Sequence, residues 1–413
     1  MGVGAGVWRR PLALMVVVSI GVVGCGRTAA PTAAESPIPS ISRAAPVTLH
    51  LTPRDGTKDT PISTEIGIEL TGGQVSDVSL TTSSGERVTG RMRADGTSWV
   101  PDRPLKPSTR YEATVTANSA DGHTTSATTS FTTMAAPTQR TQTGLYLMDG
   151  EEYGVAMPVV VEFVQPVPES ARASVQRRMF VATEPPQPGV WHWHPSGRAA
   201  YYRAPEYWQP GTTIHVRIAL DGHPTGGGRY GDQDRSATAT IGSRLAIEVD
   251  NATKQMTVTG DGVETRRLPV SLGKPSTPTS SGHMVVMSRE EQTVFDTYAE
   301  LGPVDGYRAD ISYAMRLTWG GEFIHAAPWS EADQGVRNVS HGCINLSMAD
   351  ARWLFGVVKI GDPVVVKGTE VKLEHGNGWT AWDLSWEEFA AGSALPVPDD
   401  MAQAAAATAV STT

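Results

Sequence analysis

Two stretches of this chain, KPSTRYEATV at residues 106–115 and QPGTTIHVRI at residues 209–218, resemble each other. They share a proline, a threonine and a run in which every second residue is apolar, and each follows a stretch that contains aromatic residues. Such alternation is typical of β-strands with one buried face, and short strands punctuated by Gly, Pro, Asp and Ser favour antiparallel sandwiches. The repeat therefore predicts two immunoglobulin-like domains, at 48–135 and 136–242.

The composition fits a folded, soluble protein of several domains, because 413 residues exceed the size of one ordinary core. Hydrophobic residues make up 39% of the chain and charged residues 19%, while 42 glycines and 29 prolines favour β structure over α. The formal charge of −9 is spread along the chain. Because there is no basic block, no nucleic-acid partner is expected.

A third β-rich block is predicted at 243–368, where alternating strands surround an Asp-Asn-Ala-Thr turn and a Gly-Asp-Gly turn. One helix is expected within 346–362, with Ser347 as its N-cap and Gly361 as its stop. The chain is therefore predicted to be mainly β, with two sandwiches ahead of a β-rich domain that contains a short helix.

A tryptophan-rich stretch follows this block, and we expect a small C-terminal subdomain at 369–396. Trp379, Trp382 and Trp386 have the spacing of one helix face, which predicts that they pack on a neighbouring element as core residues. The Ala/Thr-rich end at 397–413 is predicted to be disordered.

The N-terminus reads MGVGAGVWRRPLALMVVVSIGVVGC, in which Arg9 and Arg10 precede an apolar stretch too short for a stable membrane-spanning helix. This pattern predicts a signal peptide at 1–24. Its end resembles a bacterial lipobox, in which the signal is cleaved before a cysteine that then receives lipid, here Cys25. The alternative is a plain signal peptide with an incidental cysteine. Residues 25–47 would form a flexible tether to the outer face of the cytoplasmic membrane.

The second of the two cysteines, Cys343, has no disulfide partner if Cys25 carries lipid. A free thiol in an exported protein is best explained by reactivity, although most free cysteines are small core residues. Gly342 removes a side chain beside the thiol, so a substrate carbonyl could approach peptide N–H groups able to hold an oxyanion. A base is also required, and His325 ends an apolar strand in GEFIHAAPWS, where a polar side chain often points into a cleft.

The two halves together resemble the signature of the bacterial L,D-transpeptidases, a histidine followed after a short gap by Ser/Thr-His-Gly-Cys-x-Asn. Here the pattern runs from His325 to SHGCIN at residues 340–345. Residues 274–346 carry the most specific part of the resemblance. The order of lipobox, two Ig-like domains and catalytic block also resembles lipoproteins of this family from high-GC Gram-positive bacteria, which have a YkuD-type catalytic domain.

The resemblance implies an enzyme that joins two peptidoglycan stem peptides by a 3→3 link, anchored by lipid and facing the cell wall. Cys343 would attack the third-residue carbonyl of a donor tetrapeptide stem and expel the terminal D-Ala, and an acceptor amine would resolve the thioester. His325 would act as base and then acid, oriented by the backbone carbonyl of Ala326, where many relatives have serine. Acylation by carbapenem β-lactams is implied as well, and no cofactor is.

The resemblance also assigns roles to further residues. His341 is the third catalytic candidate, although it could instead support the loop structurally. Tyr307 matches a tyrosine near the oxyanion, Tyr298 one on a flap, Trp329 a tryptophan at the pocket mouth, and Asn345 would brace the site. On sequence alone the aromatic residues could equally be packing residues. The substrate-binding candidates are Tyr298, Tyr307, Ala326, Trp329, Ser340, Gly342 and Asn345.

Two other functions stay open beside the transpeptidase. If water resolves the thioester, the same nucleophile would give an L,D-carboxypeptidase. If the third domain is inactive, the protein would be a wall-binding spacer lipoprotein, since a fold and a motif do not prove turnover.

The motif WHWH at 191–194 suggests a metal site, because His192 and His194 would lie on one side of a strand. Two histidines without a nearby carboxylate or thiol make a poor site, so no metal is expected.

Overall fold

The computed structural model describes residues 47–296, 298, 302–303, 306, 308–399 and 401–402. The signal peptide, Cys25, all but the last residue of the tether, Tyr307 and most of the predicted tail lie outside these ranges. The chain divides into residues 1–44 and 45–413, and all described residues belong to the second unit. Within them, no helix has the length and apolar character needed to cross a membrane.

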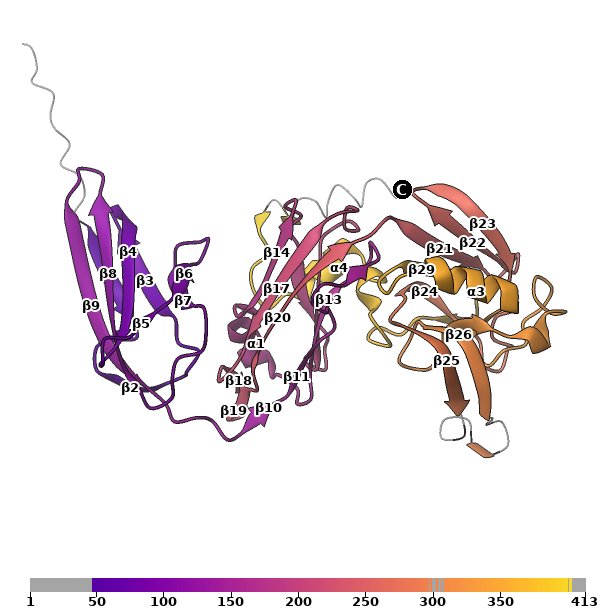
Figure 1. Cartoon of the computed structure of the whole chain (residues 1–413), viewed down its shortest axis with the longest axis horizontal. Helices are drawn as coiled ribbons and strands as arrows, with labels where there is room; N and C mark the ends of the chain where they lie inside the picture. Colours follow the sequence, from indigo (N-terminus) through magenta and orange to yellow (C-terminus); the bar gives the residue numbers. More distant parts are fainter. Residues whose placement is uncertain are drawn as a thin grey trace, which may run out of the picture. The chain divides into compact units, whose positions relative to one another are not determined.

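The first sandwich consists of two sheets drawn in indigo to purple in Figure 1. One sheet has the strand order β1 (Thr48–Thr52), β3 (Ile66–Thr71), β7 (Ser98–Pro101) and β6 (Gly90–Met92). The other has the order β2 (Thr57–Thr60), β9 (Thr124–Thr133), β8 (Arg110–Ser119), β4 (Gly73–Thr82) and β5 (Arg87–Val88). Burial alternates along β8, where Tyr111, Ala113 and Val115 point into the core. The period-two pattern thus forms the half-buried strand that the sequence predicts.

The second sandwich repeats this arrangement and adds helix α1 (Glu169–Gln176). One of its sheets has the order β11 (Thr143–Leu145), β13 (Val159–Phe163), β16 (Ala199–Arg203) and β15 (Val190–Trp193). The other has the order β12 (Glu152–Tyr153), β20 (Asp234–Ile241), β17 (Thr213–Ala219) and β14 (Met179–Glu184). A small third sheet contains β10 (Arg140–Thr141), β19 (Arg229–Gly231) and β18 (Pro224–Gly226). In β17, the alternate residues Ile214, Val216 and Ile218 are buried.

The third block has two sheets and helix α3 (Met348–Val357). The six-stranded sheet has the order β23 (Val263–Pro269), β22 (Gln255–Gly260), β21 (Leu245–Asp250), β29 (Pro363–Lys367), β24 (Ser280–Val285) and β30 (Val371–Lys372). The four-stranded sheet has the order β25 (Ser288–Asp296), β26 (Arg308–Arg316), β27 (Phe323–Ala326) and β28 (Ile344–Leu346). The prediction of a mainly β chain, with two immunoglobulin-like sandwiches ahead of a β-rich block, is confirmed.

Helix α3 begins where the sequence predicts and ends earlier. The Ser347 hydroxyl accepts a hydrogen bond from the Asp350 backbone N–H, so Ser347 is the N-cap. Val358 already has an extended backbone with ψ 148°, which ends the helix at Val357. Gly361 lies in the following turn with φ +89°, and it is therefore not the residue that stops the helix.

The C-terminal tryptophans are core residues, but they do not share one helix face. Trp379, Trp382 and Trp386 are all buried in the same apolar cluster as the second sandwich. A 3-10 turn, η2 (Thr380–Trp382), is followed by a separate helix, α4 (Trp386–Ala391). The two are separate because a capping box at Ser385, closed by the side chain of Glu388, starts a new helix. Met401, inside the predicted disordered tail, is buried and accepts a hydrogen bond from Trp386 Nε1 through its carbonyl.

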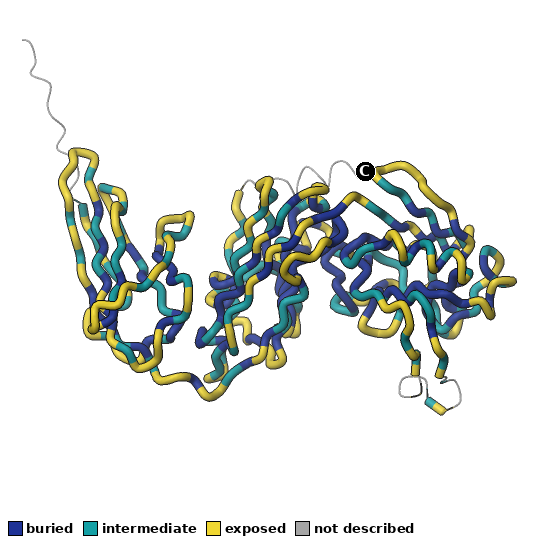
Figure 2. The backbone as a smooth tube through the Cα atoms, in the orientation of Figure 1, coloured by how far each residue is buried: buried dark blue, intermediate teal, exposed yellow. Residues whose placement is uncertain are grey.

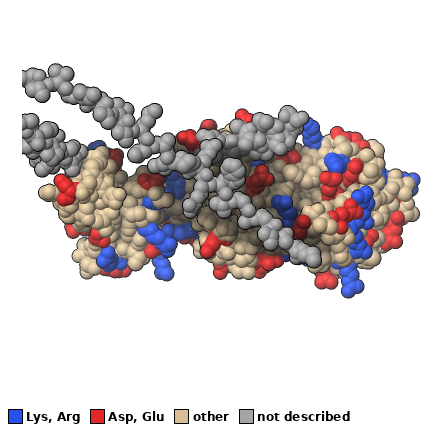
Figure 3. Space-filling view, turned by 90° about the horizontal axis from the view of Figure 1, so that it is seen from above, with Lys and Arg blue, Asp and Glu red and all other residues tan. Residues whose placement is uncertain are grey.

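Buried residues follow the inner faces of the sheets in each of the three parts, and exposed residues gather at the turns (Figure 2). Basic and acidic side chains are interspersed over the described surface of the face shown in Figure 3. On this face the mixed charges fit the spread of charge along the sequence.

Candidate active site

Two short parallel strands bring the cysteine and the histidine of the motif together. Strand β27 contains His325, strand β28 starts directly after Cys343, and His325 pairs in register with Asn345. Both side chains line one cavity of about 410 Å³. The residues that line it are Ala309, His325, Trp329, Ser330, Asp333, Val339, Ser340, His341, Cys343 and Asn345.

The His325 ring is buried and held by one backbone hydrogen bond. Its Nδ1 lies 2.7 Å from the carbonyl oxygen of Ala326, which can only accept, so Nδ1 carries the proton. In the neutral ring Nε2 then has the lone pair of a base. Burial lowers the pKa of His325 to about 4 despite the bond to Ala326, so the ring is neutral at physiological pH. Phe295 packs edge-on against it, with ring centroids 5.5 Å apart.

The Cys343 thiol is also buried and neutral. Burial raises its pKa to about 12, and this outweighs the backbone N–H of Phe323, which lowers the pKa. Its Sγ–H donates to the carbonyl oxygen of Gly321 at 3.7 Å. Nearby charges have opposite effects, because Glu322 raises the thiol pKa and Arg316 lowers it. The resting cavity is therefore lined by a neutral thiol and a neutral imidazole, rather than by a thiolate–imidazolium pair.

The loop before Cys343 is fixed by short hydrogen bonds. Ser340 Oγ donates to the Cys343 carbonyl at 2.6 Å and accepts from the Gly342 N–H at 3.2 Å. The Gly342 carbonyl accepts from Thr279 Oγ1 at 2.8 Å. Gly342 has φ +119°, a conformation that side chains with a Cβ rarely adopt. The glycine in the motif thus serves the backbone conformation as well as access to the thiol.

Asn345 connects the strand pair to the cavity wall. Its Nδ2 donates to Ser330 Oγ at 3.0 Å, and Ser330 Oγ donates in turn to the Ala327 carbonyl. The Asn345 Oδ1 is buried and has no hydrogen-bond partner among the described residues.

The sequence-based candidates have different places in the structure. His325, Trp329, Ser340, His341, Cys343 and Asn345 all line the cavity. Ala326 acts on the site through its carbonyl, which accepts a hydrogen bond from the His325 ring. Gly342 acts on it through its backbone, which has a positive φ. Tyr298 is half exposed and is not among the lining residues, and Tyr307 lies outside the described residues.

Several residues of the site are absent from the sequence-based set. Ser330 and Asp333 line the cavity, and Lys274 Nζ lies 3.0 Å from Nε2 of His341. Glu322 is largely buried, and its Cγ would lie 3.7 Å from a Cβ placed on Gly342. Lys274 opens the stretch KPSTPTSSG that carries part of the family resemblance, and this is the one signal that pointed to it.

The histidines of WHWH are engaged in packing. His192 lies on β15, where its Nδ1 bonds the Phe389 carbonyl at 2.9 Å and its ring stacks on Phe389. His194 follows the strand and bonds Ser196 through Nδ1. In the part of the chain that the structure describes, no group of three or more His, Cys, Asp or Glu residues could hold a metal ion.

Comparisons with known proteins agree with this architecture. Residues 57–224 match the family model of a bacterial Ig domain, and residues 244–366 match that of the L,D-transpeptidase catalytic domain. L,D-transpeptidase 2 of Mycobacterium tuberculosis is 31% identical over 398 residues, which cover 94% of this chain and 95% of that protein. L,D-transpeptidase 5 of the same species is 33% identical over 359 residues, 85% of this chain and 78% of that protein.

Among solved structures, the LD transpeptidase LdtMt1 in complex with imipenem is 35% identical, covers 56% of this chain and 100% of that chain, and has a TM-score of 0.47. L,D-transpeptidase 3 from Mycobacterium tuberculosis in complex with a faropenem-derived adduct is 30% identical, covers 55% of this chain and 97% of that chain, and has a TM-score of 0.45. Because a relative above 30% identity is matched over nearly the full length of both proteins, the chain belongs to the L,D-transpeptidase family of enzymes.

Proposed function

We propose that this L,D-transpeptidase forms 3→3 peptidoglycan cross-links through an acyl-enzyme on Cys343, with His325 as the base. The observation that carries the proposal is that both side chains line one cavity, with the Nδ1 of His325 committed to a backbone carbonyl. That bond leaves Nε2 as the nitrogen able to accept a proton.

In the first half-reaction, Cys343 Sγ attacks the carbonyl of the third residue of a donor tetrapeptide stem, and the thiol proton passes to Nε2 of His325. When the tetrahedral intermediate collapses, the C–N bond to the terminal D-Ala breaks. His325 returns the proton to the leaving amine, so the products are a thioester on Cys343 and free D-Ala.

In the second half-reaction, the side-chain amine of an acceptor stem attacks the thioester carbonyl. His325 takes a proton from the amine, the C–S bond breaks, and the proton returns to the sulfur of Cys343. The new amide is the cross-link, and the enzyme regains its neutral thiol and neutral imidazole.

The high pKa of Cys343 determines how the first step proceeds. With a thiol pKa of about 12 and an imidazole pKa of about 4, a free thiolate–imidazolium pair is strongly disfavoured before substrate binds. We infer that the proton leaves sulfur while the new C–S bond forms. The S–H bond directed at the Gly321 carbonyl also has to turn towards His325 before the transfer.

The decisive experiment supplies purified full-length protein with a tetrapeptide-stem muropeptide and identifies the products by mass spectrometry. A dimer with a 3→3 link plus free D-Ala is expected, and Cys343→Ala should give neither. Tripeptide and D-Ala without dimer would show a carboxypeptidase instead. No product from folded protein would support the non-catalytic spacer.

The proposal includes acylation by imipenem, with which a related transpeptidase has been solved in complex. A strained lactam carbonyl would occupy the position of the donor carbonyl, and Cys343 would open the ring. Because opening the ring expels no separate leaving group, the adduct keeps the full mass of the lactam.

We further propose that lipid on Cys25 anchors the enzyme to the outer face of the cytoplasmic membrane, where its cell-wall substrate lies. The support is the lipobox-like end of the signal sequence. In cell fractionation, Cys25→Ala protein should leave the membrane fraction, while Cys343→Ala protein should stay in it. Membrane retention of Cys25→Ala would refute the anchor.

A further inference from the structure

The loop at residues 273–279 fixes the nucleophile loop from the side. Gly273 forms a β-bridge with Ser340, and the Lys274 N–H donates to the Ser340 carbonyl at 2.9 Å. Thr279 Oγ1 donates to the carbonyl of Gly342, directly before the nucleophile. The backbone of Lys274 is therefore held in place next to the loop that carries Cys343.

The side chain of Lys274 continues this contact to a histidine of the cavity. Its Nζ lies 3.0 Å from Nε2 of His341. A lysine ammonium can only donate hydrogen bonds, so Nε2 of His341 has to accept. An imidazole that accepts through Nε2 carries its proton on Nδ1 and is neutral. This contact favours the neutral form of His341 and the tautomer with the proton on Nδ1.

The charge of His341 matters because His325 lines the same cavity. When His325 takes the thiol proton it becomes a cation, and a second imidazolium nearby would oppose that transfer. Among the described residues, the other ionisable groups that line the cavity are Cys343 and Asp333, and the charges of Glu322 and Arg316 both act on the Cys343 thiol. Lys274 itself is not among the residues that line the cavity, and its ammonium reaches the cavity through its contact with His341.

We propose that Lys274 is a positioning residue of the transpeptidase, which holds His341 as a neutral imidazole with its proton on Nδ1. Its ammonium prevents His341 from becoming a second cation in the cavity and fixes the orientation of the ring. The inference rests on the proposed function of Cys343 and His325.

The kinetic test measures the rate of imipenem acylation of full-length protein from pH 5 to pH 8. Lys274→Met is expected to lower the rate roughly 10-fold at neutral pH, the effect typical of a supporting contact. It should also add a further loss as the pH falls, because His341 then lacks the neighbouring ammonium that opposes its protonation. Lys274→Arg keeps a cationic donor and should recover most of the rate and the pH profile of the parent.

The matched control is Lys367→Met, which removes an exposed lysine of the same domain that pairs with Glu248. It should change neither rate nor profile. An unchanged rate and profile for Lys274→Met would overturn the inference, and so would a Lys274→Arg variant as impaired as Lys274→Met. If the parent is not acylated at all, the proposed function fails instead.

A second readout is independent of acylation. Long-range 1H–15N NMR of histidine-labelled protein, assigned with a His341→Gln variant, reports which ring nitrogen of His341 carries the proton. The Nδ1–H form is expected for the parent at pH 6, and a larger fraction of imidazolium for Lys274→Met at the same pH. A protonated or Nε2–H ring in the parent would contradict the inference whatever the kinetics show.

Discussion

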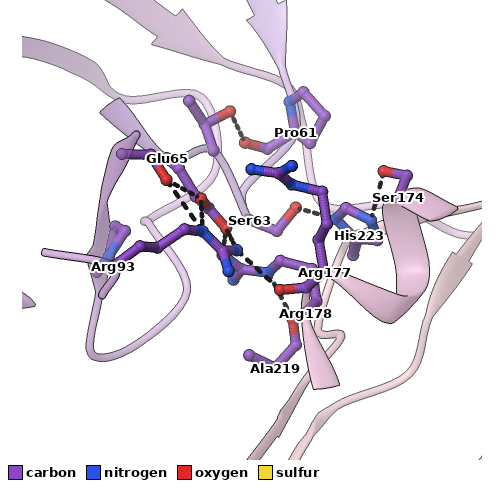
Figure 4. A network of polar contacts seen from close by, with 12 residues as sticks. Pro61, Ser63, Glu65, Arg93, Ser174, Arg177, Arg178, Ala219 and His223 are labelled. Carbon is purple, nitrogen blue, oxygen red and sulfur yellow. Dashed lines mark hydrogen bonds and ion pairs between the residues drawn. The ribbon is translucent and has the colours of Figure 1, made fainter. Parts of the chain in front are cut away.

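Two buried histidines of this chain have the same altered acidity and different surroundings. Burial lowers the pKa of both His325 and His223 to about 4. Both ring nitrogens of His223 lie 3.0 Å from serine hydroxyls, Nδ1 from Ser63 and Nε2 from Ser174 (Figure 4). Within the described part of the chain, His325 has a hydrogen bond at Nδ1 alone, to the carbonyl of Ala326, and the ring lines a cavity.

The comparison teaches that burial and a shifted pKa do not by themselves mark a catalytic group. His223 has a shift of the same size, but both its nitrogens are engaged in structural contacts. What distinguishes His325 is a nitrogen with a lone pair at a cavity that the Cys343 thiol also lines.

The surroundings of His223 form a polar network between the two sandwiches (Figure 4). Burial alone would raise the pKa of Glu65, but hydrogen bonds from Arg93, Ser98 and Arg178 outweigh it and lower the pKa to about 2. The guanidinium of Arg178 is 5% exposed and lies 2.6 Å from the Glu65 carboxylate. Glu65 is ion-paired with both Arg93 and Arg178, so its buried charge is held in structural contacts.

The largest expected difference between the two histidines is in acylation. His325→Gln should slow imipenem acylation by roughly 10²–10⁴-fold, because it removes the base. His223→Gln should leave the rate unchanged, because that ring contacts no reacting group. Rates measured by intact mass over time on both folded variants check this. An equal loss of acylation rate in both variants would show that the two histidines do not differ in function.

The next effect concerns the stability of the network. Glu65→Gln should lower the free energy of unfolding by about 3 kcal/mol, since it leaves the buried Arg178 guanidinium without its counter-charge. Thermal and denaturant unfolding of the two proteins measure the loss. The acylation rate per folded molecule should stay the same, and a variant as stable as the parent would show that the pair contributes nothing.

Acid should weaken the network in two stages. His223 has a folded pKa of about 4 against an ordinary value of 6.5, so the unfolded chain binds the proton first and stability falls between those pH values. Glu65 has a folded pKa of about 2 against 4.5, so its contribution is complete above about 4.5 and is lost as the pH falls towards 2. In unfolding measured against pH, His223→Gln should reduce the first stage, to which His325 with the same folded pKa also contributes, and leave the second stage unchanged. An undiminished first stage in His223→Gln would show that His223 does not contribute to it.

The smallest effect is expected at the mouth of the cavity. Trp329 is 62% exposed, and its ring centroid lies 6.1 Å from that of His325. Trp329→Ala should weaken donor binding by roughly 1 kcal/mol, about fivefold in KM, with kcat little changed. Steady-state kinetics with a tetrapeptide stem separate the two constants, and a loss confined to kcat would assign Trp329 a different role.

The sequence predicted most of the architecture because its signals are local. The alternation in 106–115 and 209–218 identified both sandwiches, and Ser347 capped α3 as expected. The prediction that Trp379, Trp382 and Trp386 share one helix face was wrong, because the capping box at Ser385 starts a new helix after the 3-10 turn. The limits of the individual domains stay predictions.

For the site, the motif predicted which residues meet and gave little about how they are held. The bond from His325 to Ala326 was implied by the family, and the structure has it. The contact between Lys274 and His341 joins segments far apart in the chain, so no local pattern could reveal it. The direction of the Cys343 S–H bond depends on the tertiary position of Gly321 and was equally out of reach.

The most direct test of the central claim is the intact mass of full-length protein after incubation with imipenem, beside Cys343→Ala and His223→Gln. We expect one adduct with the mass of the whole lactam on the parent and on His223→Gln, and none on Cys343→Ala. An adduct that persists on Cys343→Ala, or a folded parent that stays unmodified, would contradict the assignment of Cys343 as the nucleophile.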